Sequence, residues 1–359
     1  MVKKSIPFLG LLMLSSCSFA EQERPSLEYN FPICGQSILN EKNITKICAT
    51  RDFIALEPRK RKKDWLAFLA AEGSSGYYGP IDPVGAILKL KNQELDLQGH
   101  VWDFSNQHNS DLELRTSNMQ ITNGVILNTN IFLGGGYFSP NFNTKKQIGK
   151  SDEKVDFIYA QQYENESIEN SFINKLYASP YHIYLRSWGG GILNSKLIII
   201  QNINIDGSKS TIQKNQIISQ ANIDKDKKNF LLIKLNESFF IDVSKQIFPD
   251  RWNDKTTIPN ILYVKFSPDT VIDGNTFTLT QKNDQAYAIV LDHSPRVRIT
   301  NNTFNGFKVP ILMDQWSSIV DDKGKEIKPE QFTGYGNIIN PNKFAGHVTM
   351  NRKGEIVEK

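Results

Sequence analysis

Cysteine is scarce in this chain: only three of its 359 residues are cysteines. The sequence also lacks the paired Cys and His spacings of zinc sites, the P-loop, the G-x-S-x-G nucleophile motif and the Rossmann fingerprint. After the N-terminal residues, no apolar run is long enough to form a transmembrane helix. The net charge is only +4, which permits attraction to acidic polymers without indicating it. These absences exclude zinc fingers and nucleotide-binding proteins that carry those motifs. The sequence identifies no metal ligand or cofactor. Whether calcium binds is left open.

The N-terminus has the pattern of an export signal. Lys3 and Lys4 precede an apolar run at residues 6–14, which is too short to span a bilayer and is followed by small residues. Two cleavage sites compete. The Ser-Phe-Ala sequence at residues 18–20 suits ordinary signal peptidase. The Leu-Ser-Ser-Cys sequence ending at Cys17 resembles the lipobox of bacterial lipoproteins, in which the cysteine is lipidated and becomes the mature N-terminus.

The cysteine count favours the lipobox. If Cys17 carries lipid, Cys34 and Cys48 remain as an even pair that can form a disulfide in an oxidising compartment. A loop of that length would contribute about 3 kcal/mol of stability. The alternative is a secreted protein with free thiols. Both readings predict an extracytoplasmic protein. Ser18 resembles the residue that follows the cysteine in outer-membrane lipoproteins. We therefore expect a lipid anchor in the outer membrane, facing the periplasm or the surface, and otherwise a periplasmic or secreted protein.

Internal similarity is the strongest signal in the sequence. The segment KFSPDTVIDGNTF at residues 265–277 aligns without a gap with DHSPRVRITNNTF at residues 292–304. Upstream of the second segment, YAIVL at residue 287 matches YHIYL at residue 181. We also match IQNINIDG at residues 200–207 to ITNNTFNG at residues 299–306, and weaker copies begin at Ile121 and Asn337.

These repeats are short, rich in β-forming residues and divided by Asn, Gly and Ser-Pro turns. One copy cannot bury an apolar face alone, so successive copies must stack. The intervals are too short for crossover helices, which argues against βαβ units. A recurring inner asparagine, such as Asn275 and its match Asn302, can hydrogen-bond its equivalents in the neighbouring copies.

The pattern resembles the right-handed parallel β-helix of pectate-lyase-like and periplasmic β-helix-repeat proteins, over roughly residues 95–344. The resemblance implies an all-β solenoid. It leaves the function open, because this fold carries lyases, hydrolases, epimerases, adhesins and phage spikes. No catalytic motif of the family is matched, so the resemblance assigns no catalytic residue here.

The remaining segments are assigned around that solenoid. Residues 1–17 form the signal peptide with its lipobox, and residues 18–94 form an N-terminal segment with the cysteine loop. In that segment Asp64 is a predicted N-cap and Gly73 a predicted end of a short amphipathic helix that covers the first coil. The basic run at residues 59–63 is interpreted as a solvated surface segment.

Two insertions and two hairpins complete the assignment. The repeat is interrupted near residues 134–167 and 236–259, where aromatic residues favour binding loops over disorder. The segments IVDDKGKEIK and VTMNRKGEIVE each predict a hairpin around a glycine turn. We expect these hairpins, including the C-terminal tail at residues 345–359, to cover the last coil or its edge strands.

The segment YHIYLRSWGGG carries the main functional hypothesis. With the two-residue period of a strand, Ile183 and Leu185 point inward. The opposite side collects four polar or aromatic side chains: His182, Tyr184, Arg186 and Trp188. At the matching positions near residue 290 the chain has Ala, Val and Asp, so the repeat itself does not require His, Tyr and Arg. The segment is therefore either a functional surface or the solvent-facing side of an ordinary sheet.

These side chains suit the β-elimination of a uronic-acid polymer. Arg186 offers a planar fork for the carboxylate. His182 or Tyr184 can act as base or acid, and Trp188 can pack on a sugar ring. We therefore expect an acidic polysaccharide as partner and a lyase as the most favoured enzyme, ahead of a glycoside hydrolase or uronate epimerase. The alternative is a non-catalytic envelope protein that binds glycan or a partner protein.

Further candidates for substrate binding are weaker. Four are interpreted either as a second wall of the same groove or as a solvated charge cluster: Asp292, His293, Arg296 and Arg298. Tyr137 is a further candidate in the aromatic first insertion. The outward aspartates, including Asp292 and Asp314, are expected to lie singly, so the close carboxylate pair of a glycosidase is not predicted. Nucleic acid is not an expected partner, and the sequence does not predict an oligomeric state.

Overall fold

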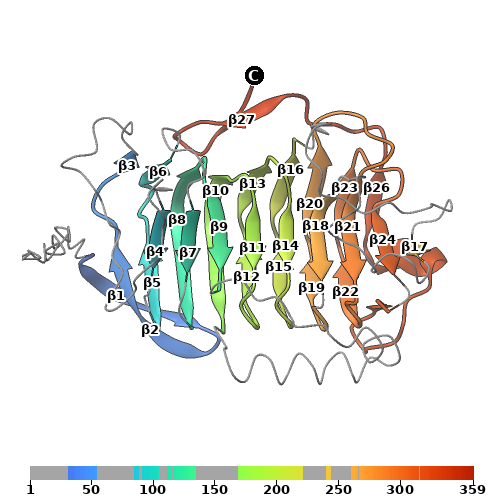
Figure 1. The fold of residues 1–359 in the computed structure, drawn as a ribbon, viewed down its shortest axis with the longest axis horizontal. Helices are drawn as coiled ribbons and strands as arrows, with labels where there is room; N and C mark the ends of the chain where they lie inside the picture. The colour runs from blue at the N-terminus through green and yellow to red at the C-terminus, as the bar shows by residue number, and fades with distance from the viewer. Residues whose placement is uncertain are drawn as a thin grey trace, which may run out of the picture.

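The computed structural model describes residues 31–54, 85–88, 91–104, 111–114, 117–134, 169–220, 240–243, 260–265, 267–314 and 316–359. Across these residues the chain winds into the right-handed parallel β-helix that the repeats predict, with successive coils stacked from the N-terminal to the C-terminal end (Figure 1). Tyr137, Cys17, the predicted helix near residues 64–73 and most of the insertion at residues 134–167 lie outside the described residues. In the part of the chain that is described, no helix is long and apolar enough to cross a membrane.

Two sheets enclose the core. The seventeen-stranded sheet contains β1 (Ile33–Leu39), β2 (Lys42–Cys48), β3 (Phe53–Ile54), β5 (Gln93–Asp96), β6 (Val101–Asp103), β8 (Met119–Leu127), β10 (Ser171–Ser179), β12 (Gly191–Leu193), β13 (Lys196–Ile199), β15 (Thr211–Gln213), β16 (Gln216–Ser219), β19 (Val271–Asp273), β20 (Thr276–Leu279), β22 (Val297–Thr300), β23 (Thr303–Asn305), β25 (Ile319–Val320) and β26 (Ile338–Asn340). The nine-stranded sheet contains β4 (Gly85–Leu88), β7 (Asp111–Leu114), β9 (Asn130–Leu133), β11 (Ile183–Leu185), β14 (Ile203–Ile205), β17 (Phe240–Val243), β18 (Asn260–Lys265), β21 (Tyr287–Asp292) and β24 (Ile311–Asp314). A typical coil contributes two strands to the larger sheet and one to the smaller, as β19, β20 and β21 do.

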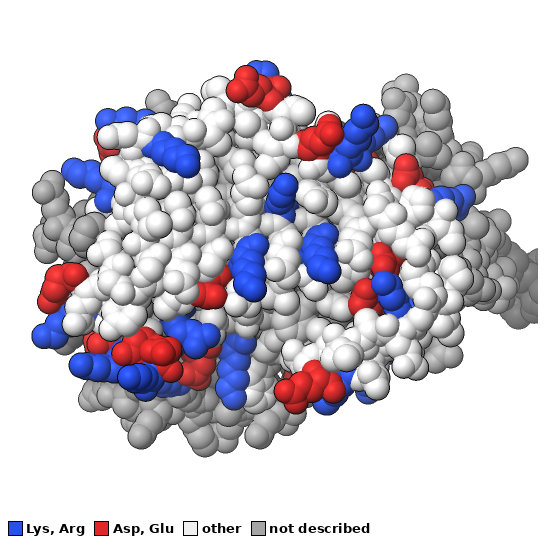
Figure 2. All heavy atoms as spheres, turned by 180° about the vertical axis from the view of Figure 1, so that it is seen from behind, with Lys and Arg blue, Asp and Glu red and all other residues white. Residues whose placement is uncertain are grey.

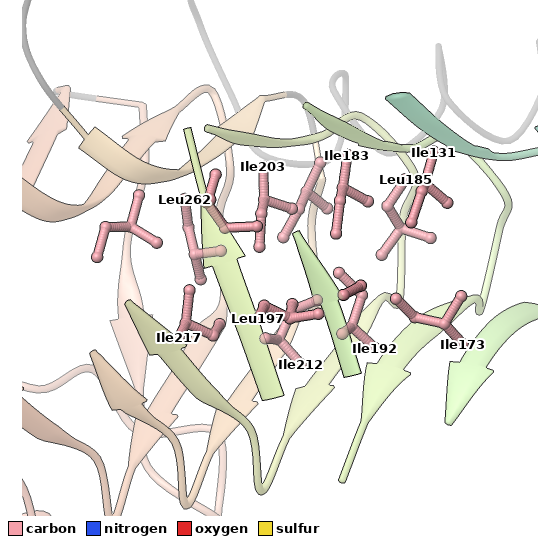
Figure 3. Close-up of a cluster of buried hydrophobic side chains, with 14 of the residues drawn as sticks. Ile131, Ile173, Ile183, Leu185, Ile192, Leu197, Ile203, Ile212, Ile217 and Leu262 are labelled. Carbon is pink, nitrogen blue, oxygen red and sulfur yellow. The ribbon is translucent and has the colours of Figure 1, made fainter. Parts of the chain in front are cut away.

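The core lies between the two sheets and consists of stacked aliphatic rows. On the nine-stranded sheet, Ile183 is in register with Ile203, which is in register with Leu262. These residues face a second row on the larger sheet that includes Ile192 and Ile212 (Figure 3). All of them are fully buried. Because each coil presents the same inward positions, every inward side chain packs on its equivalents, and a fully buried Ile or Leu contributes about 1.5–3 kcal/mol.

The predicted asparagine ladder is present at the turn between the two columns of strands in the larger sheet. The side-chain oxygen of Asn302 accepts hydrogen bonds from the backbone N of Asn275 at 2.9 Å and from its Nδ2 at 3.0 Å. Nδ2 of Asn275 also donates to the carbonyl of Ile212 at 2.7 Å. The same pattern joins Asn215 to Asn275 and Asn302 to Asn337. These buried amides satisfy one another from coil to coil, as their hydrogen-bonding capacity requires.

The Ser-Pro repeat marks a second internal ladder. The backbone N of Ser267 donates to Oγ of Ser294 at 3.0 Å, and the backbone N of Ser294 donates to Oγ of Ser317 at 3.0 Å. Oγ of Ser294 in turn donates to the carbonyl of Val264 at 3.1 Å. The serine therefore recurs because it fills the hydrogen-bonding needs of a buried turn.

One predicted repeat match is wrong. Residues 200–207 contain β14, which pairs with β11 and β18 in the nine-stranded sheet. Residues 299–306 contain β23, which pairs with β20 in the larger sheet. The other matches hold, since Ile121 and Ile299 occupy the same column of the larger sheet and Asn337 follows Asn302 in the ladder. Short strands in both sheets have the same apolar alternation, so similarity alone did not assign this segment to its sheet.

The N-terminal end of the larger sheet is closed by an antiparallel hairpin, β1–β2. The predicted disulfide joins Cys34 to Cys48 within it, with a Cα–Cα distance of 5.9 Å. Strands β2, β3 and β4 already pair in parallel with β5, β6 and β7. The coiled architecture therefore begins before residue 95, where the repeat becomes readable in the sequence.

The second insertion contributes a strand to the opposite end. β17 pairs in parallel with β24, the last coil's strand in the nine-stranded sheet, with Phe240 opposite Ile311. This segment leaves the solenoid after β16 and returns at β18. Its strand β17 therefore covers the last coil, although it comes earlier in the chain than that coil. No sequence pattern predicted this edge strand.

The C-terminal segment forms the predicted hairpin, β27 (Val348–Met350) with β28 (Ile356–Glu358). Its position differs from the prediction. It runs back along the outside of the larger sheet toward the first coils (Figure 1), where Val348 and Met350 pack on a row of apolar side chains: Val101, Val125, Leu127, Ile198 and Ile218. Arg352 lies 2.8 Å from the carboxylate of Asp103. The hairpin therefore packs on apolar side chains that point outward from the larger sheet.

The other predicted hairpin is a short one. An antiparallel bridge joins Val320 to Glu326 around Gly324, whose φ is +77°. A 3-10 helix, η3 (Pro329–Tyr335), follows and ends at Gly336 before β26. Phe332 of η3 packs in the core with a ring-centroid distance of 5.8 Å to Phe304. The segment covers the last coil, as predicted.

We predict that Asn302→Ala lowers the free energy of unfolding by about 3 kcal/mol, because it leaves buried partners of the ladder unsatisfied. Asn204→Ala, on the half-buried outer side of β14, should cost less than about 1 kcal/mol. Urea denaturation of the two variants measures the difference. Equal losses would mean that the ladder contributes no more than an ordinary surface asparagine.

Candidate functional site

The outer side of β11 carries the three residues that were predicted to be catalytic. Ile183 and Leu185 are fully buried. On the opposite side His182 and Tyr184 are half-buried and Arg186 is largely buried. The ring of Tyr184 stacks on Phe132 of the preceding coil at 4.6 Å and 10°. The ring of His182 lies 5.4 Å from that of Tyr184.

His182 also belongs to a polar row that crosses the coils. Its Nδ1 lies 3.1 Å from Oδ1 of Asn202 on the next coil. Nδ2 of Asn202 donates to Oδ1 of Asn260 at 3.3 Å. These side chains thus hydrogen-bond from one coil to the next, as the inner asparagines do. The bond to Asn202 holds the imidazole of His182 in place through one ring nitrogen.

Arg186 is already held by a carboxylate of this chain. Its Nε lies 3.6 Å from Oδ2 of Asp206 on the next coil, and its side chain is only 10% exposed. The guanidinium carbon lies 4.9 Å from the ring centroid of Tyr184 and 5.7 Å from that of Phe132. Burial raises the pKa of Asp206, against the attraction of Arg186 and Lys265. To bind a substrate carboxylate, Arg186 would first have to leave Asp206.

Trp188 does not continue the outer face of β11. The strand ends at Leu185, and Trp188 forms a bridge with Glu169 at the turn between the two sheets. Its ring lies 5.2 Å from Nζ of Lys209. The predicted alternation stops here because the three glycines form a tight corner. A Cβ at Gly191 would lie 2.4 Å from the carbonyl of Thr211.

The two arginines of the predicted second wall lie elsewhere. Arg296 binds both carboxylate oxygens of Asp269, with Nε–Oδ1 at 2.8 Å and Nη2–Oδ2 at 3.2 Å. This pair stands at the corner between the sheets. Arg298 is on β22 in the larger sheet. Neither arginine shares the outer side of β11, so the predicted groove with walls from both sets of residues is not formed by them.

Asp292 and His293 were predicted to face substrate or solvent, and that prediction is wrong: both are buried, and they form a cluster with Asp314. Leu291 pairs with Met313, so the residues that follow them, Asp292 and Asp314, come together on neighbouring strands. Nδ1 of His293 lies 2.8 Å from Oδ1 of Asp292 and 3.1 Å from Oδ2 of Asp314. The expectation that these aspartates lie singly is therefore wrong. The matching Asp-x-Ser and Asp-x-x-Ser patterns, at residues 292–294 and 314–317, are the signal that could have shown it.

The cluster is held in place by further contacts. The hydroxyl of Tyr263 donates to Oδ2 of Asp292 at 2.5 Å, and Oγ of Ser317 donates to Oδ1 of Asp314 at 2.6 Å. The ring of Trp316 stacks on His293 at 4.2 Å and 15°. Burial lowers the pKa of His293, but the hydrogen bonds and charges of the two aspartates outweigh it, so that the net pKa is raised.

The larger sheet carries a group of basic residues on the face that Figure 2 shows, where Lys and Arg side chains stand in the middle with few acidic side chains between them. Lys175, Lys196 and Lys214 are exposed on consecutive coils. In the described part of the chain, none of the three forms an ion pair with a carboxylate. Nζ of Lys196 lies 5.5 Å from the ring centroid of Tyr177, which is 37% exposed. We call these four residues the lysine surface.

Acidic side chains on the same sheet are already engaged. Nζ of Lys46 lies 2.5 Å from the carboxylate of Asp96. Asp269 is bound by Arg296, as described above. Asp273 accepts hydrogen bonds from three side chains, those of Gln213, Thr300 and Asn301. Asp96 and Asp269 are thus neutralised by basic partners. Burial raises the pKa of Asp273, but the hydrogen bonds from Thr300, Asn301 and Gln213 outweigh it and lower the pKa, so this carboxylate keeps its negative charge.

Comparison of the chain with protein-family models, with curated proteins and with solved structures found no match. The pectate-lyase-like character therefore remains a resemblance in architecture, and any function must be argued from the residues themselves.

We predict that Arg186→Ala lowers the free energy of unfolding by about 2 kcal/mol, because the substitution removes the partner of a largely buried carboxylate. Arg298→Ala, on the larger sheet, should cost less than about 1 kcal/mol. Chemical denaturation measures both. An Arg186→Ala variant as stable as the parent protein would instead indicate that Arg186 is kept for a function rather than for the fold.

Proposed function

We propose that this chain is an exported, lipid-anchored β-helix protein that binds an acidic polysaccharide along the lysine surface and does not cleave it. The observation that carries the proposal is a set of exposed ammonium groups on three consecutive coils. Lys175 and Lys214 occupy matching positions two coils apart, and Lys196 lies two residues further along the coil between them. Neighbouring parallel strands are spaced by about 4.8 Å. The three charges therefore lie within a few strand spacings of one another, close enough to contact neighbouring carboxylates of an extended uronic-acid polymer.

Aromatic side chains beside the lysines support a sugar ligand over a simple anion. Tyr177 presents an exposed ring next to Lys196. Trp188, with Lys209 over its ring, stands at the border of the same sheet. A flat ring can pack on the apolar face of a sugar, while its polar atom stays in contact with water.

Export is supported by the disulfide between Cys34 and Cys48, since such bonds persist in oxidising compartments. The lipid on Cys17 and the outer-membrane location follow from the lipobox pattern and belong to the proposal. The architecture also favours carbohydrate, because it resembles that of pectate-lyase-like proteins. A requirement for calcium remains open in this proposal.

The β-elimination hypothesis receives less support. Arg186 is largely buried against Asp206 and two aromatic rings, and Trp188 lies beyond the end of the strand that carries the other three residues. The guanidinium of the proposed catalytic set is thus engaged within the protein, and Trp188, its predicted sugar-binding residue, is not on the same face. Binding without cleavage is the function that the geometry supports best.

The binding proposal can be tested with the protein lacking residues 1–17 and immobilised pectate, alginate and hyaluronate. At least one polymer should bind, and binding should weaken with salt because the contacts are ionic. Replacing Lys175, Lys196 and Lys214 by Ser should weaken binding more than tenfold. A matched control replaces the exposed Lys323, Lys325 and Lys328 by Ser, with the same change in net charge. If both triple variants lose affinity equally, the lysine surface is not the binding site.

The absence of cleavage can be tested on the same polymers by ultraviolet absorbance of unsaturated uronates, with a reducing-end assay alongside. We expect no signal in either assay, with or without added calcium. A rise in absorbance that disappears in a folded Arg186→Ala variant would establish a lyase and restore the outer side of β11 as its site. New reducing ends without absorbance would establish hydrolysis.

A further inference from the structure

We propose that Asp292, His293 and Asp314 bind one divalent transition-metal ion, such as Zn²⁺ or Mn²⁺. Three donor atoms converge in this cluster: Nδ1 of His293, a carboxylate oxygen of Asp292 and a carboxylate oxygen of Asp314 all lie within 4.8 Å of one another. No sequence motif marks these ligands, because they are brought together by strand register.

The cluster brings two carboxyl groups together in a buried position, where a cation is favoured. Asp292 and Asp314 are each 2% exposed and stand beside one another on neighbouring parallel strands. Two carboxylates in such a position repel each other, and burial makes the repulsion stronger. The imidazolium of His293 can neutralise one of the charges. A divalent cation can neutralise both, so the geometry favours metal binding beyond the role of a buried ion pair.

The surrounding hydrogen bonds divide each carboxylate into an inner and an outer oxygen. Oδ2 of Asp292 accepts from the hydroxyl of Tyr263 at 2.5 Å. Oδ1 of Asp314 accepts from Oγ of Ser317 at 2.6 Å and from the backbone N of Trp316 at 3.3 Å. The other oxygen of each carboxylate faces Nδ1 of His293. This is the arrangement of metal sites, in which outer-shell donors orient the ligating carboxylates.

His293 itself is fixed in direction. Its backbone φ is +49°, and its ring stacks on Trp316 at 4.2 Å. The backbone N of His293 also donates to Oδ2 of Asp314 at 3.0 Å, which leaves further lone-pair capacity on that oxygen. The imidazole nitrogen is therefore aimed at the two inner oxygens by the backbone as well as by packing.

The distances suit an ion of this class. Ligand bonds to such ions are about 2.0–2.1 Å long, so two ligands lie about 2.9 Å apart at octahedral angles and about 3.3 Å apart at the tetrahedral angles of Zn²⁺, for which the cluster would open slightly. The separations of Nδ1 from the inner oxygens are 2.8 and 3.1 Å. One imidazole and two carboxylates suit zinc, manganese or iron. Calcium prefers six to eight oxygen ligands, which makes it the weaker candidate. Since the ligands are buried, we assign the ion a structural role, in which it joins β24 to the turn that follows β21.

Binding must conserve charge and protons. The ion occupies the position between Nδ1 and the two inner oxygens, so a proton held there by Nδ1 leaves to solvent when the ion enters. Each ion bound to the protonated cluster therefore releases one proton, and binding weakens as the pH falls.

The test uses tag-free protein lacking residues 1–17, treated with chelator and then titrated with ZnCl₂ or MnCl₂ by calorimetry in two buffers of different protonation enthalpy. We expect saturation at one ion per chain, a Kd below 10 µM as an order of magnitude for a three-residue site, proton release and a Tm raised by several degrees. Asp314→Asn and His293→Gln should abolish these effects. His347→Gln, which changes an exposed histidine, should leave them unchanged.

Tyr263→Phe provides a variant that keeps all three ligands. Removing its hydrogen bond to Asp292 should weaken metal affinity about 10–100-fold while the protein stays folded. If the ligand variants fail to fold, the metal titration and the Tm of the unsubstituted protein decide the question. No saturable binding up to 100-fold above the expected Kd, with an unchanged Tm, would overturn the proposal. So would binding that persists unchanged in folded His293→Gln. Neither result bears on polysaccharide binding, which involves the other sheet.

Discussion

Register between successive coils is the constraint on which this structure depends. In a parallel β-helix each inward residue packs on its equivalents, and a shift of one residue would turn every inward isoleucine to the outside. The asparagine ladder opposes such a shift because each amide bonds both to the next asparagine and to a backbone carbonyl. Apolar packing supplies the energy of the fold, and the buried amides fix one alignment of the coils.

Register also explains how residues far apart in the sequence form the functional candidates. Arg186 meets Asp206, and Asp292 meets Asp314, because each pair occupies matching positions on neighbouring strands. In the lysine surface, Lys196 is in register with Tyr177, while Lys175 and Lys214 match each other across the coil between them. A single outward substitution in one copy of a repeat creates an isolated side chain. The same position altered in successive copies creates a row along the solenoid.

The fold was largely predictable, and the functional surfaces were not. The alignment of residues 265–277 with residues 292–304 was sufficient to predict stacked coils and the Asn275–Asn302 contact. The inward direction of Ile183 and Leu185 followed from alternation. The positions of Trp188 and Arg296 could not be predicted in this way, because side chains alternate between the two sides only within a strand, and both residues lie outside one. The cluster around His293 was missed because one copy of the repeat has an extra residue before its serine. The edge strand β17 depends on a long excursion that carries no repeat.

The path of the C-terminal hairpin changes how the solenoid as a whole can unfold. A stack of coils that contact only their neighbours behaves as a linear chain of units, which can fray from either end. Here Arg352 reaches Asp103, 249 residues earlier in the sequence, and Val348 and Met350 cover coils from both halves of the stack. Loss of the first coils would therefore also release the last segment. The hairpin couples the two ends and makes their unfolding a single cooperative event, at the cost of a contact that can form only late in folding.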